Sequence, residues 1–102
     1  MRRTGLALLK RNAAEAAGFM ALLANDKRLR ILCELMEAGE LSVGALAQAV
    51  NLSQSALSQH LAKLRAGGIV ETRRESQIVH YRLGRDARVS RAMALLKQLF
   101  CK

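Results

Sequence analysis

The sequence predicts a mainly α-helical domain with a small β-hairpin, in the element order of a winged helix-turn-helix. Apolar residues recur at helical spacing through four successive segments up to residue 66, and the spacing then changes to the alternation of two short strands. One more helical segment follows at 87–100. Because 102 residues fit one domain, a single winged helix-turn-helix accounts for residues 1–102.

The first helix is expected over 5–23, where no proline interrupts the pattern. Gly18 in its interior lowers the stability of a helix by about 1 kcal/mol relative to alanine and marks a position where this helix is weakened. Asn25 and Asp26 are natural N-cap residues for the next helix, which Gly39 ends. The expected buried face of this second helix consists of Leu29, Leu32, Cys33 and Met36.

A helix-turn-helix is predicted over 42–66 from capping residues and apolar spacing. Ser42 caps a short helix at 43–50, and the turn Asn51-Leu52 follows. Ser53 caps a longer helix that reaches residue 65 or 66 and is stopped by Gly67-Gly68. Its buried residues are expected at i, i+4 and i+7, namely Leu57, Leu61 and Leu64.

The wing is predicted over 69–83, as strands at 69–72 and 77–83 joined by a polar turn at 73–76. The last helix, 87–100, aligns Val89, Met93, Leu96 and Phe100. The terminal helices, 5–23 and 87–100, carry more apolar surface than a domain of this size can cover. We therefore expect a homodimer that forms through these two helices.

The charge balance indicates a polyanionic partner. Seventeen Lys and Arg residues face eight Asp and Glu residues, which gives a net charge of +9. Counterion release from phosphates favours nucleic-acid binding by such a chain, although a merely solvated basic surface has the same composition. Only Phe19, Tyr81 and Phe100 are aromatic, too few for stacking single-stranded bases. Double-stranded DNA is thus the expected partner.

The exposed tip of the second helix of the helix-turn-helix is almost wholly hydrogen-bonding, as base reading in the major groove requires. The expected DNA-contacting residues at this tip are Ser53, Gln54, Ser55, Ser58, Gln59 and His60. Ser53 among them is expected to cap the helix and to approach a phosphate. The expected phosphate contacts are Lys63, Arg65, Arg73, Arg74 and Arg82, with Arg73 and Arg74 at the wing tip. These residues also have a purely structural interpretation. Gln54, Ser55, Ser58 and Gln59 would then form an ordinary polar helix face, Ser53 would only cap the helix, and His60 would be a surface residue that is partly packed.

Other function classes find little support in the sequence. No apolar run approaches the roughly 18 residues of a membrane span. The basic start Met1-Arg2-Arg3 is followed by a stretch that charged residues interrupt, unlike a signal peptide, so a reducing cytoplasm and no membrane partner are expected. No phosphate-cradling glycine loop or paired-carboxylate site appears, which argues against an enzyme and a cofactor. In that compartment Cys33 and Cys101 are either inert core thiols or a redox pair.

Three runs of sequence resemble the ArsR/SmtB family of bacterial repressors. They are LANDKRLRIL at 23–32, LSVGALA at 41–47 and LSQSALSQHLAKL at 52–64. The resemblance continues through Gly68-Ile69-Val70 to Tyr81 and covers about four-fifths of the chain. It implies a dimeric repressor that binds a palindromic operator in duplex DNA and is released by an inducer.

The usual metal inducers of that family lack their ligands here. The second helix has one cysteine, Cys33, where the arsenic type has neighbouring cysteines, and the last helix has no histidine or acid for zinc. Cys33 together with Cys101 resembles the persulfide- and redox-responsive branch of BigR-, SqrR- and HlyU-like repressors. This resemblance implies that reactive sulfur species or oxidants link the two thiols within one subunit and weaken operator binding.

Two alternatives stay open from the sequence. The chain is also compatible with an ArsR-type repressor that answers a metal or another signal, in which both cysteines are incidental. The second alternative is a winged-helix protein–protein adaptor that does not bind DNA. The polar face of the second helix and the basic wing argue against it.

Overall fold

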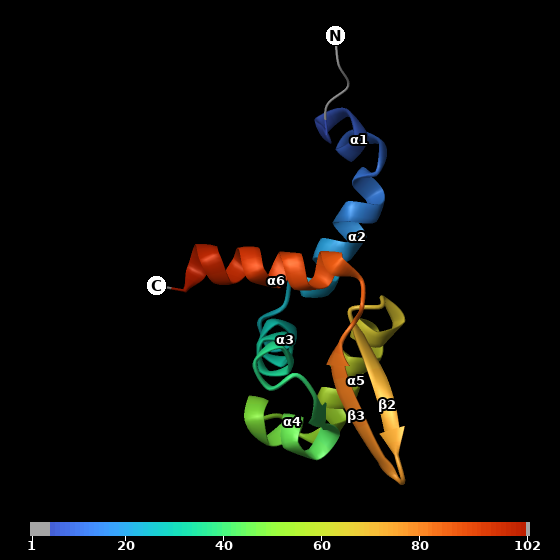
Figure 1. The fold of residues 1–102 in the computed structure, drawn as a ribbon, viewed down its shortest axis with the longest axis vertical. Helices are drawn as coiled ribbons and strands as arrows, with labels where there is room; N and C mark the ends of the chain where they lie inside the picture. The colour runs from blue at the N-terminus through green and yellow to red at the C-terminus, as the bar shows by residue number, and fades with distance from the viewer. Residues whose placement is uncertain (1–4, 102) are drawn as a thin grey trace.

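The computed structural model describes residues 5–101 and confirms the winged helix-turn-helix (Figure 1). Its elements are α1 (Gly5–Arg11), α2 (Ala13–Leu23), α3 (Asp26–Ala38), β1 (Leu41–Ser42), α4 (Val43–Val50), α5 (Gln54–Ala66), β2 (Val70–Glu75), β3 (Ile78–Leu83) and α6 (Ala87–Phe100). Across these residues no helix combines the length and the apolarity that a membrane crossing requires. The basic start Met1-Arg2-Arg3 lies outside the described residues.

Local capping interactions set the helix boundaries that the sequence predicts. Asn25 Oδ1 accepts a hydrogen bond from the Arg28 backbone N–H at 3.0 Å. Ser42 Oγ and Ser53 Oγ accept from the third residue of α4 and of α5, at 3.2 and 3.1 Å. Asn51 turns the chain between α4 and α5 with φ 56°, a left-handed conformation that asparagine tolerates better than most residues. The helix-turn-helix is therefore specified by residues close together in sequence.

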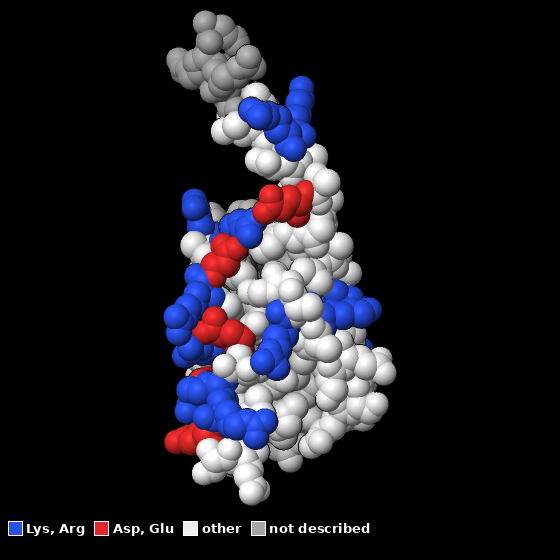
Figure 2. All heavy atoms as spheres, turned by 90° about the vertical axis from the view of Figure 1, so that its right-hand side faces the viewer, with Lys and Arg blue, Asp and Glu red and all other residues white. Residues whose placement is uncertain are grey.

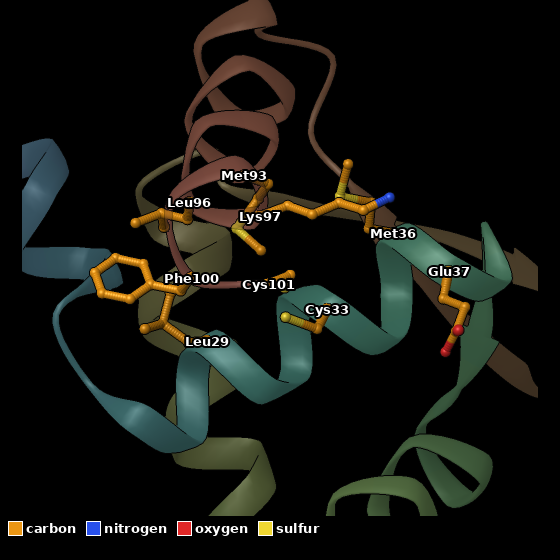
Figure 3. Close-up of a pocket in the computed structure, with 9 residues that line it drawn as sticks. All are labelled: Leu29, Cys33, Met36, Glu37, Met93, Leu96, Lys97, Phe100 and Cys101. Carbon is orange, nitrogen blue, oxygen red and sulfur yellow. The ribbon is translucent and has the colours of Figure 1, made fainter.

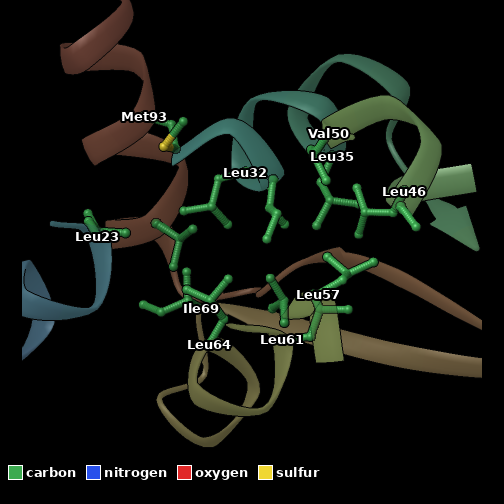
Figure 4. Packing of buried hydrophobic residues seen from close by; sticks show 14 residues of the cluster. Leu23, Leu32, Leu35, Leu46, Val50, Leu57, Leu61, Leu64, Ile69 and Met93 are labelled. Atoms are coloured by element: carbon green, nitrogen blue, oxygen red, sulfur yellow. The ribbon is translucent and has the colours of Figure 1, made fainter. Parts of the chain in front are cut away.

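The core lies between α3, α4, α5 and the sheet (Figure 4). The expected buried face of α5, formed by Leu57, Leu61 and Leu64, is confirmed. The expected face of α3 is wrong in part, because the helix buries Ile31, Leu32 and Leu35. Cys33 and Met36 are exposed instead. The reason is that α4, α5 and β3 pack on one side of α3 and leave the Cys33 side to α6 alone.

The N-terminal helix is divided where the sequence predicted a continuous helix over 5–23. The division falls at Asn12, a weak helix former, whereas Gly18 lies inside α2. Only Leu23 of these two helices is buried, and α1 points away from the rest of the molecule (Figure 1). Leu6, Leu9 and Met20 are consequently exposed by 69%, 51% and 66%.

The sheet is antiparallel in the order β1-β3-β2, and it differs from the predicted hairpin in two respects. The two-residue strand β1, which the sequence did not predict, pairs Leu41 with Tyr81. The first strand of the wing continues to Glu75, so the turn is Ser76-Gln77 and not 73–76. The expectation that Arg73 and Arg74 form the wing tip is therefore wrong. Both are strand residues, because cross-strand pairing with His80 and Val79 extends the ladder past them.

Candidate nucleic-acid interface and cysteine-lined cavity

Helix α5 presents its polar side chains to solvent along one face. Its first turn and the N-cap before it expose three predicted contact residues, Ser53, Gln54 and Ser55. One turn further along, Ser58 and Gln59 are exposed as well. The opposite face of α5 is held in the core, so the polar face has a fixed orientation. This is the arrangement that a helix needs to enter a DNA groove.

His60 lies at the edge of this polar face and is half-buried. Burial lowers the pKa of its imidazole, and the positive charges of Arg28, Lys63 and Lys27 lower it further. The ring is therefore mostly neutral at pH 7, and it offers one donor and one acceptor and no charge. This partial packing agrees with the alternative, left open by the sequence, that His60 is a partly packed surface residue.

The predicted phosphate-binding residues fall into two electrostatic groups. Within residues 5–101, Lys63, Arg65 and Arg74 are exposed and form no ion pair with an acidic side chain. Arg73 and Arg82, by contrast, each form an ion pair with a carboxylate. In Figure 2 red and blue spheres alternate along the left-hand edge of the face shown, while blue spheres at its right have no red neighbours.

Two carboxylates neutralise these wing arginines. Arg73 Nη2 and Nε donate to the two oxygens of Glu40 at 2.6 and 3.1 Å, which makes a bidentate pair. Arg82 Nε donates to Glu71 Oε1 at 2.8 Å, and Arg85 shares that oxygen at 3.3 Å. The hydrogen bond from Arg73 is the main reason that the pKa of Glu40 is lowered. Both carboxylates are thus ionised at neutral pH.

A hollow of about 470 Å³ lies between α5 and the wing. Ser58, Ala62 and Arg65 line it from α5, and Tyr81 lines it from β3. Sequence reasoning did not select Tyr81 as a functional residue, because its alternation with Val79 and Leu83 only suggested one face of a strand. The place of Tyr81 in this hollow can be found only once the sheet is placed beside α5.

The two cysteines, far apart in sequence, line one cavity between α3 and α6 (Figure 3). The cavity measures about 630 Å³. Its wall is mostly apolar, with Leu29 and Met36 of α3 facing Met93 and Leu96 of α6, and it also includes Glu37 and Lys97. Both thiols are free and exposed. The structure therefore brings together Cys33 and Cys101, which the sequence could pair only by resemblance.

The electrostatic surroundings of Cys33 favour its neutral thiol. Although Cys33 is exposed as a residue, the partial burial of its thiol raises the pKa most, and the charge of a Cys101 thiolate raises it next. The carboxylates of Glu34 and Glu37 contribute in the same direction. Because a thiolate is the reactive form, Cys33 is a poor first nucleophile at neutral pH.

The described part of the chain contains no group of three or more His, Cys, Asp or Glu side chains placed to hold a metal ion. His60 and His80 in particular lie on separate elements, α5 and β3. The arrangement of the side chains thus offers two chemical features, a polar and basic helix face and a pair of thiols.

Comparison with known proteins gives consistent matches. Residues 25–72 match the family model described as bacterial regulatory protein, arsR family. The transcriptional activator HlyU of Vibrio cholerae is 47% identical over 94 residues, which cover 92% of this chain and 85% of HlyU. The biofilm growth-associated repressor of Xylella fastidiosa is 40% identical, with 91% of this chain and 80% of that protein covered.

Solved structures agree with these relatives. The transcriptional repressor BigR from Xylella fastidiosa superposes with a TM-score of 0.86 at 38% identity, covering 98% of this chain and 99% of BigR. Reduced HlyU from Vibrio cholerae superposes with a TM-score of 0.83 at 47% identity, covering 92% and 97%. These similarities extend over nearly the whole described chain.

Proposed function

This chain belongs to the bacterial ArsR family of regulatory proteins, and from that premise we propose that it is a transcriptional repressor whose operator binding is lost when Cys33 and Cys101 become linked. As a member of the family it is a DNA-binding transcriptional regulator. The observation that carries the finer proposal is the shared cavity, in which both free thiols lie between α3 and α6.

The DNA contacts of the proposal divide between bases and phosphates. Gln54, Ser55, Ser58 and Gln59 read base edges, since amide and hydroxyl groups match the donors and acceptors of the major groove. Ser53 caps α5 and also approaches a phosphate, and the neutral His60 supplements these contacts. Of the predicted phosphate contacts, Lys63, Arg65 and Arg74 remain part of the proposal. Arg73 and Arg82 pair with Glu40 and Glu71, and their proposed role is to position the wing.

A homodimer completes the proposed operator complex. Exposed apolar side chains concentrate on α1, α2 and α6, among them Leu6, Met20, Leu99 and Phe100, with exposed fractions of 60–78%. Burial of about 1,000 Å² or more between two copies would cover this surface. Two α5 helices related by two-fold symmetry then face a palindromic operator, with half-sites one helical turn apart.

Reactive sulfur species are the proposed inducer. In the reaction with an organic persulfide RSSH, one cysteine thiolate attacks the outer sulfur and releases RS⁻. The second cysteine then attacks the modified sulfur and releases HS⁻, which leaves a disulfide between Cys33 and Cys101. With protons counted, the two thiols and RSSH give the disulfide, RSH and H₂S, so the persulfide is the oxidant. That one relative is described as reduced HlyU supports redox sensitivity in this branch.

The link changes DNA binding because it constrains α3 against α6. Closing a loop of about 70 residues corresponds to roughly 4 kcal/mol in the chain-entropy model. Only the part of this energy that differs between two native conformations shifts the equilibrium between them. A difference of about 1.4 kcal/mol already changes that equilibrium constant tenfold. Since α3 packs on α4 and α5, a small displacement of α3 reaches the helix-turn-helix directly. In a rigid dimer, that displacement misaligns the two reading helices.

An electrophoretic mobility shift on the DNA upstream of the protein's own operon tests the proposal. Reduced protein, persulfide-treated protein, and the treated variants Cys33→Ser and Cys101→Ser are compared, with mass spectrometry to confirm an intramolecular link. We expect the treated wild type to lose at least tenfold in affinity and both variants to keep theirs. A confirmed link without loss of affinity would contradict the proposed mechanism. Binding that is absent or independent of salt would contradict operator binding itself and favour a protein–protein adaptor.

A further inference from the structure

The hollow between α5 and the wing has the donors of an anion site. We propose that a backbone phosphate of the bound duplex sits in this hollow, held by Arg65 and Tyr81, and that Tyr81 is therefore a DNA-binding residue. The inference rests on the DNA binding proposed above and adds a phosphate site and a contact residue that the sequence did not indicate.

The lining of the hollow supplies donors and no competing acid. Six residues line it, and none of them is acidic. Arg65 is exposed in the last turn of α5 and forms no ion pair among the residues that the structure describes. The Tyr81 hydroxyl makes no hydrogen bond to any side chain or backbone group within 5–101. A phosphodiester only accepts hydrogen bonds, so it complements a guanidinium and a phenol hydroxyl.

The wing arginines are less suited to the same task. Arg73 already satisfies both oxygens of Glu40, and Arg82 shares Glu71 with Arg85. A phosphate approaching Arg73 would meet the Glu40 carboxylate, whose negative charge opposes it. Arg73 instead ties β2 to the residue that precedes β1, so its contribution is to position the wing.

The position of the hollow fits the path of a DNA strand. When a recognition helix lies in the major groove and the wing meets the adjacent minor groove, the backbone that separates the two grooves passes between helix and wing. In this chain that passage runs along the residues of α5 and β3 that line the hollow. The phosphate is thus placed by two elements at once, which fixes how deeply α5 enters the groove.

The experiment measures affinity against salt concentration for the full-length protein on operator and random duplexes. Tyr81→Phe removes only the hydroxyl and keeps the ring that packs on the core, so the fold is preserved. We expect it to weaken both duplexes alike, by about tenfold, with the salt slope unchanged. Arg65→Gln should weaken binding to both duplexes and reduce the salt slope by the amount expected for the loss of about one phosphate contact. Arg73→Gln, the matched arginine control, should leave the slope as in the wild type.

Phosphate and base contacts are then separated with duplexes that carry a single neutral methylphosphonate. At one position this change should weaken the wild type but not Arg65→Gln. Wild-type affinity in Tyr81→Phe, an effect confined to the operator duplex, or a slope that falls in Arg73→Gln but not in Arg65→Gln would each overturn the inference. A wild-type protein that binds no duplex would instead refute the proposed function.

Discussion

Cys33 on α3 and Cys101 directly after α6 line the same cavity, and each is free. A thiolate at Cys101 raises the pKa of Cys33, which means that the two sulfur atoms are within electrostatic range of each other. Burial and two carboxylates act in the same direction. The two thiols thus face one cavity, and their surroundings favour the neutral form of Cys33.

Glu37→Gln should make Cys33 more reactive. Glu37 lines the cavity and is one of the charges that raise the pKa of Cys33, so its removal lowers that pKa and increases the thiolate fraction at neutral pH. Burial is the largest cause and stays, and solvent screens the charge, so we expect alkylation about twofold faster. Iodoacetamide kinetics of the Cys101→Ser background measure this, with Glu15→Gln as a distant control. An unchanged rate would show that Glu37 does not influence the thiol.

Met20→Glu should produce a folded monomer. Met20 is 66% exposed on α2, in the apolar surface that the proposed dimer buries, and a carboxylate there would be desolvated without a partner. Sedimentation equilibrium should give a monomer at micromolar concentration, and operator affinity should fall by at least tenfold. Ile78→Glu is the matched control, because Ile78 is 53% exposed but lies on the wing. Equal effects of both substitutions would contradict a dimer through the terminal helices.

Gln54→Ala should relax base preference at one operator position. The amide of Gln54 is exposed in the first turn of α5, and its loss removes about 1–3 kcal/mol of discrimination between the right and the wrong base. Binding to a library of single-base operator variants measures the change, and affinity for random duplex should stay the same. Ser58→Ala should act similarly at a neighbouring position. Uniform weakening of all duplexes would assign these residues to the backbone instead.

Glu40→Gln should lower the melting temperature in a pH-dependent manner. The hydrogen bond from Arg73 lowers the pKa of Glu40 in the folded state, so ionised Glu40 stabilises the fold above the ordinary glutamate value of 4.5. This contribution disappears as the pH falls through the lowered folded-state pKa. We expect a difference of a few degrees at pH 7 and none at about pH 2, measured by circular dichroism. A difference that persists in acid would exclude the ion pair as its cause.

Gly84→Ala and Gly18→Ala should have opposite effects on stability. A Cβ at Gly84 would meet the backbone of Gly68 and Ile69, which cannot move aside as a flexible side chain can. We expect a loss of about 1–3 kcal/mol. A Cβ at Gly18 meets nothing within 4 Å, and alanine favours the interior of α2 by about 1 kcal/mol. Urea unfolding of the two variants measures both values, and a stabilised Gly84→Ala would contradict the close approach.

The sequence determined the elements whose boundaries depend on neighbouring residues. Ser42 and Ser53 cap helices at the predicted positions because a side-chain oxygen meets a backbone N–H three residues on. The spacing of Leu57, Leu61 and Leu64 likewise defines the buried face of α5 and, by exclusion, the polar face proposed to read DNA. The strand β1 could not be predicted in this way, because two residues become a strand only through pairing with β3.

Only the tertiary structure decided which side of α3 is buried and which charges are free. The periodicity of α3 is compatible with several faces, and the packing of α4, α5 and β3 selects the one without Cys33. The same packing leaves the thiols facing a shared cavity, brings Glu40 to Arg73 across the chain, and places Tyr81 beside Arg65. Contacts between residues far apart in sequence have no local signal, because their geometry exists only once the helices and the sheet have packed.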